Sequence, residues 1–267
     1  MIKVLIVEDS PVIREFLTGI LSSDPELYVV GSATNGEDAI SAVQELKPDV
    51  ITMDIHMPRV NGFDATRRIM ETNPMPIVIV SGSSTAEEVS TTFHALKAGA
   101  LAVVRRPFGI GHAEHEHSCA ELIQTVKLMA EVKVVRRWQR ATSPPKSHTM
   151  VPVVTAAREV RLVAIGSSTG GPLALQAILM RLPQEFPVPI VVVQHMSEGF
   201  IQGFAEWLGQ STPLQVHVAT QGEFLLPGHV YLAPDGYHLE VRHDLRVLLR
   251  SDEPENGLRP SVARLFR

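Results

Sequence analysis

Short apolar runs alternate with longer amphipathic stretches over the first 107 residues of the chain. The apolar runs are rich in β-branched residues and end at polar or turn residues, which is typical of buried strands. Between them the apolar positions recur about every 3.6 residues, which predicts helices. Strands are predicted at 3–7, 28–33, 49–54, 76–81 and 101–106, and helices at 11–22, 36–46, 62–72, 86–98 and 119–138. Five such repeats predict a doubly wound α/β domain, in which helices cover both faces of a parallel sheet.

A change of composition separates this series from a second one. Residues 139–158 hold two adjacent prolines among scattered serines and threonines, which is typical of an interdomain linker. Beyond it, strands are predicted at 160–168, 189–195, 214–219, 229–233, 238–242 and 245–250, and helices at 172–182 and 199–210. The second of these helices carries large apolar residues on one face, namely Phe200, Phe204, Trp207 and Leu208. We therefore predict two doubly wound parallel-sheet α/β domains, over 1–125 and 159–267, with a helix end and linker over 126–158 between them.

Composition narrows the class of protein. The net charge of −5 argues against nucleic acid as the main partner. Cys119 is the single cysteine, which excludes an internal disulfide and suits a reducing cytoplasm. The N-terminus lacks the long apolar core of a signal peptide, and no run of about 18 apolar residues predicts a membrane span. We expect a cytoplasmic protein that neither binds nucleic acid nor inserts into a membrane.

Polar side chains gather where the strands of the first domain end. Glu8 and Asp9 end the first strand, Asp54 the third and Ser81 the fourth, and Arg106 follows the fifth. Ligands of doubly wound sheets bind at this edge, and three converging carboxylates predict Mg²⁺ there. We predict Asp54 as a nucleophile toward a phosphoryl donor, with Ser81 and Arg106 contacting the phosphoryl oxygens. The alternative is that these acids are helix caps or solvated loop residues.

A glycine-rich segment holds the candidate chemistry of the second domain. Ser167 and Ser168 end a predicted strand, and the spacing Gly166-x-Ser168-x-Gly170 resembles a nucleophile elbow, which favours Ser168 as the nucleophile. His195 ends the next predicted strand, so the two side chains can meet at neighbouring strand ends. The alternatives are a phosphate-binding turn for the glycines and a capping or packing role for the histidine.

The motifs of the first domain identify its family by resemblance. VLIVEDS, DVITMDIHMPRVNG, IVIVSG and ALKAGALAVVRRP resemble the receiver domain of bacterial two-component response regulators. The resemblance implies a flavodoxin-like fold with Asp54 as the phospho-acceptor. It implies that Glu8, Asp9 and Asp54 hold Mg²⁺, and that Ser81 and Arg106 sense the phosphate. Two positions depart from the family pattern, because Arg106 stands in place of a lysine and Val103 in place of an aromatic switch residue.

The motifs of the second domain extend the resemblance to nearly the whole chain. AIGSSTGGPLAL, VVVQHMSEGF, LLPGHVYLAPDGYHLEV and RPSVARLF resemble the catalytic domain of the chemotaxis response-regulator protein-glutamate methylesterase. The resemblance implies a Rossmann-like serine hydrolase with Ser168 as nucleophile and His195 as general base, and no cofactor for ester hydrolysis. It implies methylated glutamates on the cytoplasmic helices of chemoreceptors as substrates, deamidation of receptor glutamines in many members, and a chemotaxis histidine kinase as phosphodonor.

One part of the family pattern has no counterpart in this sequence. The resemblance implies a third catalytic residue, an aspartate in a GMGxDG-like turn well beyond RPSVxxLF, and no such turn occurs. Asp235, in APDGYH, belongs to a different part of the pattern. We therefore expect the methylesterase domain to be C-terminally truncated and the esterase activity of this chain to be low. The alternative is a non-enzymatic receiver-type signalling protein with a remnant esterase domain. A nucleotide-binding domain is disfavoured, because the glycines lack a P-loop lysine and an acidic ribose partner.

Overall fold

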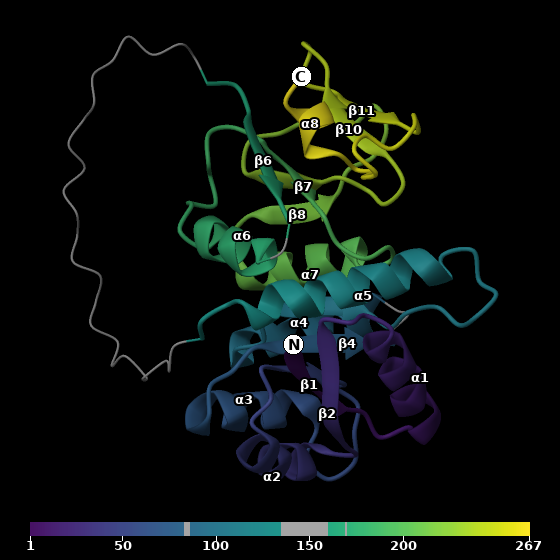
Figure 1. Cartoon of the computed structure of the whole chain (residues 1–267). Helices are drawn as coiled ribbons and strands as arrows, with labels where there is room; N and C mark the ends of the chain where they lie inside the picture. Colours follow the sequence, from purple (N-terminus) through teal and green to yellow (C-terminus); the bar gives the residue numbers. More distant parts are fainter. Residues whose placement is uncertain (83–85, 135–159, 169) are drawn as a thin grey trace.

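The structure, a computed structural model, describes residues 1–82, 86–134, 160–168 and 170–267 (Figure 1). The predicted linker at 139–158 and the last residues of the helix predicted at 119–138 lie outside these ranges. Two parallel sheets are present, one in the first half of the chain and one in the second. Helices α4 and α7 lie between the two sheets in Figure 1. Among the helices of the described residues, none is long and apolar enough to cross a membrane.

The first sheet has five parallel strands in the order β2-β1-β3-β4-β5, which is the flavodoxin-like order that the receiver resemblance implies. Its strands are β1 (Ile2–Val7), β2 (Leu27–Ala33), β3 (Val50–Met53), β4 (Ile77–Ser81) and β5 (Ala102–Arg105). Its helices are α1 (Pro11–Ser22), α2 (Gly36–Leu46), α3 (Gly62–Thr72), α4 (Ala86–Ala98) and α5 (His115–Ala130). The prediction of a doubly wound α/β domain is confirmed.

Local chemistry explains where these helices begin. The side chains of Ser10, Asn35 and Asn61 each accept a hydrogen bond from a main-chain N–H in the first turn, which caps α1, α2 and α3. The prediction for the fifth helix was wrong at its start, since α5 begins at His115 rather than at residue 119. Its first turn carries histidines and a glutamate, which give no apolar periodicity to detect.

The second sheet has four parallel strands in the order β6-β7-β9-β8. They are β6 (Val163–Ser167), β7 (Ile190–Gln194), β8 (Gln215–Val218) and β9 (His229–Leu232). Helices α6 (Gly171–Leu179) and α7 (Ile201–Ser211) pack against one face. The other face is covered by an antiparallel hairpin of β10 (His238–Val241) and β11 (Val247–Arg250) together with the short α8 (Val262–Leu265). The sheet is therefore parallel as predicted, but within the described residues a hairpin takes the place of long helices on one face.

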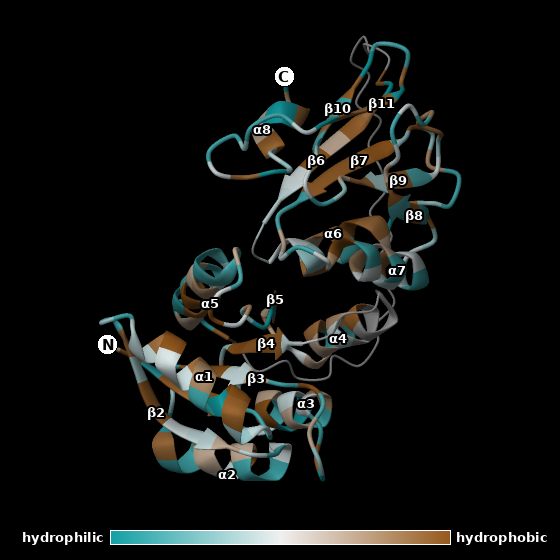
Figure 2. Ribbon diagram, turned by 90° about the vertical axis from the view of Figure 1, so that its right-hand side faces the viewer, coloured by the Kyte–Doolittle hydropathy of each residue, from teal (hydrophilic) through white to brown (hydrophobic). Residues whose placement is uncertain are grey.

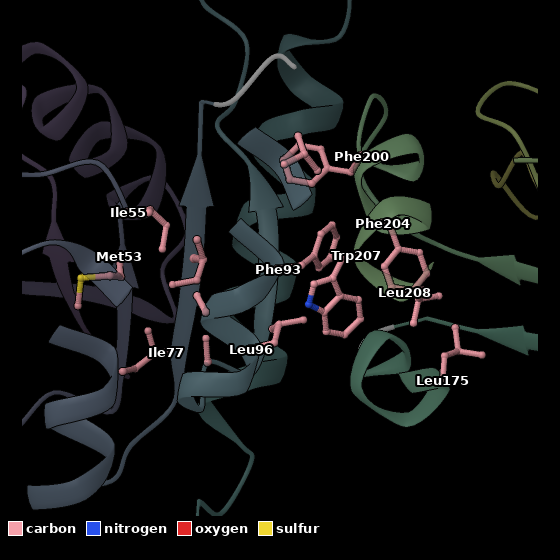
Figure 3. Close-up of a cluster of buried hydrophobic side chains, with 14 of the residues drawn as sticks. Met53, Ile55, Ile77, Phe93, Leu96, Leu175, Phe200, Phe204, Trp207 and Leu208 are labelled. Carbon is pink, nitrogen blue, oxygen red and sulfur yellow. The ribbon is translucent and has the colours of Figure 1, made fainter. Parts of the chain in front are cut away.

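Hydrophobic residues run along β4 and β7, the strands that Figure 2 shows in brown. All five residues of each strand are buried, as expected for a parallel strand covered on both faces. One buried cluster continues from the first sheet through α4 and α7 into the second sheet. Figure 3 shows its centre, where Phe93 of α4 faces Phe204 and Trp207 of α7 and Phe200 at the N-cap of that helix. The apolar face predicted for the helix at 199–210 is thus buried against the first domain.

Candidate functional site

Three acidic side chains meet at the carboxyl edge of the first sheet. Glu8, Asp9 and Asp54 each place a carboxylate oxygen within 4.8 Å of the others. Glu8 and Asp54 are buried and Asp9 is exposed, so the cluster opens to solvent on one side. The loop after β3 folds tightly back, because a Cβ at Gly62 would lie 1.9 Å from the main-chain oxygen of Asp54. A glycine at this position is required by that close approach.

Burial and mutual repulsion control the charge of this cluster. Burial, and next the charge of Asp54, raise the pKa of Glu8 from its ordinary 4.5 to about 7. Burial likewise raises the pKa of Asp54, while hydrogen bonding opposes it: the main-chain N–H of Ile55 donates to Oδ1 of Asp54 at 2.8 Å. Oε2 of Glu8 is buried and has no hydrogen-bond partner among the described residues. An oxygen-rich cluster with a buried carboxylate oxygen that accepts no hydrogen bond from the described residues fits a hard divalent cation such as Mg²⁺.

Arg106 and Ser81 flank the acids, as the sequence predicted. Nη2 of Arg106 lies 4.0 Å from Oε2 of Glu8. Gly82 makes room for this guanidinium, since a Cβ there would lie 2.7 Å from its atoms. Oγ of Ser81 is buried at the end of β4 and lies 3.4 Å from Oγ1 of Thr92. The five residues predicted for the first site therefore come from the ends of β1, β3, β4 and β5.

Ser168 and His195 lie at the ends of the neighbouring strands β6 and β7. The pairing of the two strands continues into this region, because the main-chain N–H of His195 donates to the carbonyl of Ser167 at 2.9 Å. Oγ of Ser167 donates to the side chain of Gln194 at 2.6 Å, so this hydroxyl is already engaged. Ser168 is exposed, whereas Ser167 is half-buried. The structure thus favours Ser168 over Ser167 as the serine accessible to a substrate.

The imidazole of His195 is half-buried beside this turn. Burial lowers the pKa of His195, and a hydrogen bond to the main chain of Pro260 opposes that effect. Its Nε2 is buried and has no hydrogen-bond partner among the described residues, so no hydrogen bond joins this nitrogen to Ser168. A lowered pKa keeps the imidazole neutral at pH 7, which is the form that a general base requires.

Gln194 is a site residue that sequence reasoning missed. Its side chain is 3% exposed and bonds to the strand ends that carry Ser168 and His195. The apolar run before it predicted a strand but gave no reason to assign its polar end a function. The sequence does place a polar glutamine directly after three valines, at a position where a buried strand usually has an apolar residue.

The loop after His195 is held by the first domain, and this contact was also missed. Oγ of Ser197 accepts from the main-chain N–H of Arg105 at 3.2 Å and donates to Glu121 at 2.7 Å. Nη1 of Arg105 donates to the carbonyl of Glu198 at 3.1 Å. Within the second domain, the carboxylate of Asp235 accepts from the main-chain N–H of Gly199 at 2.8 Å. Arg105 therefore links the end of β5 to the segment that follows the candidate base.

Each half of the chain matches the model of a known protein family. Residues 4–115 match the family model described as response regulator receiver domain, and residues 163–267 match the model described as CheB methylesterase. The chain is thus a response regulator whose second domain is of an enzymatic type.

Full-length relatives make the assignment specific. Over its whole length the chain is 56% identical to a protein-glutamate methylesterase/protein-glutamine glutaminase of Nitrosospira multiformis, and the match covers 76% of that relative. It is 52% identical to a protein of the same name from Geobacter metallireducens, and this match covers the whole chain and 77% of the relative. Half of the chain is also similar, at 37% identity and a TM-score of 0.45, to 98% of the response regulator domain of CheB from Thermotoga maritima. The chain belongs to the CheB family of receiver-linked methylesterases, which are hydrolases.

Proposed function

We propose that this protein hydrolyses methyl esters of glutamate side chains on chemoreceptor helices, with Ser168 as nucleophile and His195 as general base. The observation that carries the proposal is the position of these two residues at the ends of adjacent parallel strands, one exposed and one half-buried. The exposure of Ser168 suits a substrate carried on another protein. The names of the relatives add glutamine side chains as a second substrate.

The reaction is an acyl transfer in two steps. His195 takes the proton of Ser168 Oγ as that oxygen attacks the ester carbonyl, and a tetrahedral oxyanion forms. The oxyanion collapses, methanol leaves with the proton from His195, and the glutamyl group remains on Ser168. Water, deprotonated by His195, then attacks this ester and releases the glutamate and the free serine. A glutamine substrate releases ammonia in place of methanol.

Methanol release from a methylated chemoreceptor fragment tests the proposal. Ser168→Ala is expected to abolish release, since it removes the hydroxyl proposed as the nucleophile. Ser167→Ala is the matched control, because it removes a neighbouring hydroxyl that is hydrogen-bonded to Gln194. Full loss of turnover in Ser167→Ala with turnover retained in Ser168→Ala would assign the nucleophile to Ser167 instead.

For the first domain we propose that Asp54 accepts a phosphoryl group from a chemotaxis histidine kinase. Glu8, Asp9 and Asp54 supply the oxygen ligands for Mg²⁺, which neutralises charge on the phosphoryl group when it is bound. Ser81 and Arg106 contact the phosphoryl oxygens. Labelling with acetyl phosphate tests this role. Asp54→Asn is expected to abolish labelling, and Asp244→Asn, at an exposed aspartate of the second domain, is expected to leave it unchanged.

Phosphorylation of Asp54 regulates the second domain in this proposal through the contacts between the domains. Arg106 faces the acidic site, and its neighbour Arg105 holds Ser197 and Glu198 beside the candidate base. A phosphoryl group adds about two negative charges next to Arg106 and attracts its guanidinium, and a movement of Arg106 shifts the adjacent Arg105 and its contacts. Hydrogen exchange of the 195–200 segment is expected to rise on treatment with acetyl phosphate, and Asp54→Asn is expected to remove that response.

A second candidate is a receiver-type signalling protein with little esterase activity. It is favoured by the imidazole of His195, whose ring hydrogen bond goes to the main chain of Pro260 and, among the described residues, to no carboxylate. In a serine hydrolase an orienting acid contributes about 10⁴-fold to kcat. The two candidates differ in one measurement. Methanol release comparable to that of a longer family member supports the hydrolase, and release at the level of Ser168→Ala supports the signalling protein.

A further inference from the structure

We infer that Gln194 is a positioning residue of the hydrolytic site, whose side-chain amide ties the strand end that carries Ser168 to the one that carries His195. The inference rests on the roles proposed for those two residues. It concerns the side chain that fixes the separation of Ser168 and His195. The descriptions of the matching families and relatives give no role to this side chain.

The side-chain amide of Gln194 is hydrogen-bonded on both of its ends. Its Oε1 accepts from Oγ of Ser167 at 2.6 Å. Its Nε2 donates to the carbonyl of Ser168 at 3.0 Å and to the carbonyl of His195 at 2.6 Å. Both N–H hydrogens and the oxygen of one buried amide are thus used on two chain segments that are 26 residues apart in the sequence.

A core role does not account for this residue. Gln194 directly follows Val191, Val192 and Val193, which are fully buried, and an apolar side chain would continue that strand without desolvating an amide. A buried amide is tolerated because all its hydrogen bonds are made, and a buried polar group left without its hydrogen bonds destabilises the fold. Its partners lie in the turn of the candidate nucleophile and at the candidate base. These hydrogen bonds therefore fix the geometry of the site rather than stabilise the core of the sheet.

The start of α6 is shaped to admit the amide. A Cβ on Gly171 would lie 2.0 Å from Oε1 of Gln194 and 2.9 Å from Cβ of Ser167. No side chain other than that of glycine fits there while Gln194 keeps its place. Gly171 also donates its main-chain N–H to the carbonyl of Ser168 at 2.7 Å, the same carbonyl that receives Nε2 of Gln194. Two donors therefore fix the backbone of the nucleophile.

Because of these hydrogen bonds, the two serines have different roles. Ser167 gives its hydroxyl to Gln194, which leaves Ser168 as the residue whose main chain is anchored while its side chain remains exposed. The main-chain carbonyl of His195 is anchored by the same amide. A misplacement of about 1 Å between reacting groups costs about 10²-fold in rate. Loss of the amide is therefore expected to lower kcat rather than to weaken substrate binding.

Three variants of the full chain test the inference. Gln194→Glu keeps the shape and the acceptor but removes both N–H donors and turns a carboxylate oxygen toward two carbonyls. Gln194→Met keeps the length and removes all polarity. Ser167→Ala is the matched control, since it removes one bond and leaves both N–H donors of Gln194 in place. The measurements are kcat and KM for methanol release from a methylated chemoreceptor fragment, the rate at which phenylmethanesulfonyl fluoride labels Ser168, and the thermal unfolding midpoint.

We expect both Gln194 variants to lose about 10²-fold in kcat and in labelling rate, with KM close to that of the parent. Ser167→Ala is expected to lose less than about tenfold, because the two main-chain anchors remain. Either Gln194 variant that keeps the parent kcat and labelling rate overturns the inference. So does a loss of rate that matches the unfolded fraction of the variant at the assay temperature. If Ser168→Ala retains turnover and labelling, the proposed nucleophile fails instead, and that result is read independently of the Gln194 variants.

Discussion

The ring of Phe93, on α4 of the receiver domain, lies with its centroid 5.6 Å from that of Trp207, on α7 of the methylesterase domain. Phe93 is 2% exposed and Trp207 is fully buried, and both belong to the buried cluster that spans the two domains. Phe200 and Phe204 complete the contact around the same ring (Figure 3). The interface between the domains is therefore packed in the manner of a domain core rather than a transient surface.

Phe93→Ala is expected to loosen this interface. The substitution removes the ring that fills the space between the helices and leaves a cavity, at a cost of about 3–5 kcal/mol. We expect a larger radius of gyration by small-angle X-ray scattering and earlier proteolysis between the domains. Leu128→Ala, at an exposed position of α5, serves as the control and should leave both unchanged. A parent-like radius and digestion pattern for Phe93→Ala would show that other contacts hold the domains together.

Arg105→Ala is expected to release the loop that follows His195. The substitution removes the hydrogen bond from Nη1 to the carbonyl of Glu198 and the stacking of the guanidinium over Phe108, 4.4 Å from its ring centroid. A hydrogen bond to a charged donor contributes about 1.5–3 kcal/mol. Hydrogen exchange of the 195–200 segment should accelerate accordingly. Arg68→Ala, at an exposed arginine of α3, is the control, and equal exchange in the two variants would contradict a role for Arg105.

Stability of the metal-free protein should fall as the pH rises from about 4.5 to about 7, because of Glu8. Its pKa is raised by burial and by Asp54 to about 7 in the folded protein, above its ordinary 4.5. The unfolded chain therefore loses this proton first, and the stabilisation present below pH 4.5 is lost through that window. The loss is at most about 3 kcal/mol in the free energy of unfolding.

Glu8→Gln isolates this contribution. The variant is expected to show a flatter dependence of its unfolding free energy on pH between 5 and 7, measured by urea denaturation, than the parent. Addition of Mg²⁺ should stabilise the parent more than the variant, because a ligand that binds only the folded state raises its stability. Identical pH slopes in the two proteins would place the ionisation of Glu8 outside this range.

Gly171→Ala is expected to disrupt the turn of Ser168 by displacing the side-chain amide of Gln194. The added Cβ would lie 2.0 Å from the amide oxygen of Gln194, so the amide or the start of α6 must shift. We expect the labelling rate of Ser168 by phenylmethanesulfonyl fluoride to fall. Gly209→Ala is the matched control, because its Cβ in α7 would meet nothing closer than 3.9 Å. An equal effect of the two substitutions would mean that the turn tolerates the displacement.

The sequence by itself predicted most of the strands and helices and the side chains that meet at the carboxyl edges of the two sheets. The period of the apolar positions placed the strands of the first domain within one or two residues, since a strand buried on both faces leaves a continuous apolar run. Parallel strands present their carboxyl ends at one edge, so polar residues at those ends predicted the meeting of Glu8, Asp9 and Asp54. The same rule brought Ser168 and His195 to adjacent strand ends.

Only the tertiary structure decided which surfaces meet and which polar groups pair across them. Periodicity showed that the helix of Phe200, Phe204 and Trp207 has an apolar face, but not that Phe93 covers it, because that pairing depends on the three-dimensional approach of two domains. The roles of Gln194 and Arg105 could not be assigned from the sequence for the same reason. Their partners are distant in the chain, and a hydrogen bond between distant segments is set by the packing that brings them together rather than by local sequence.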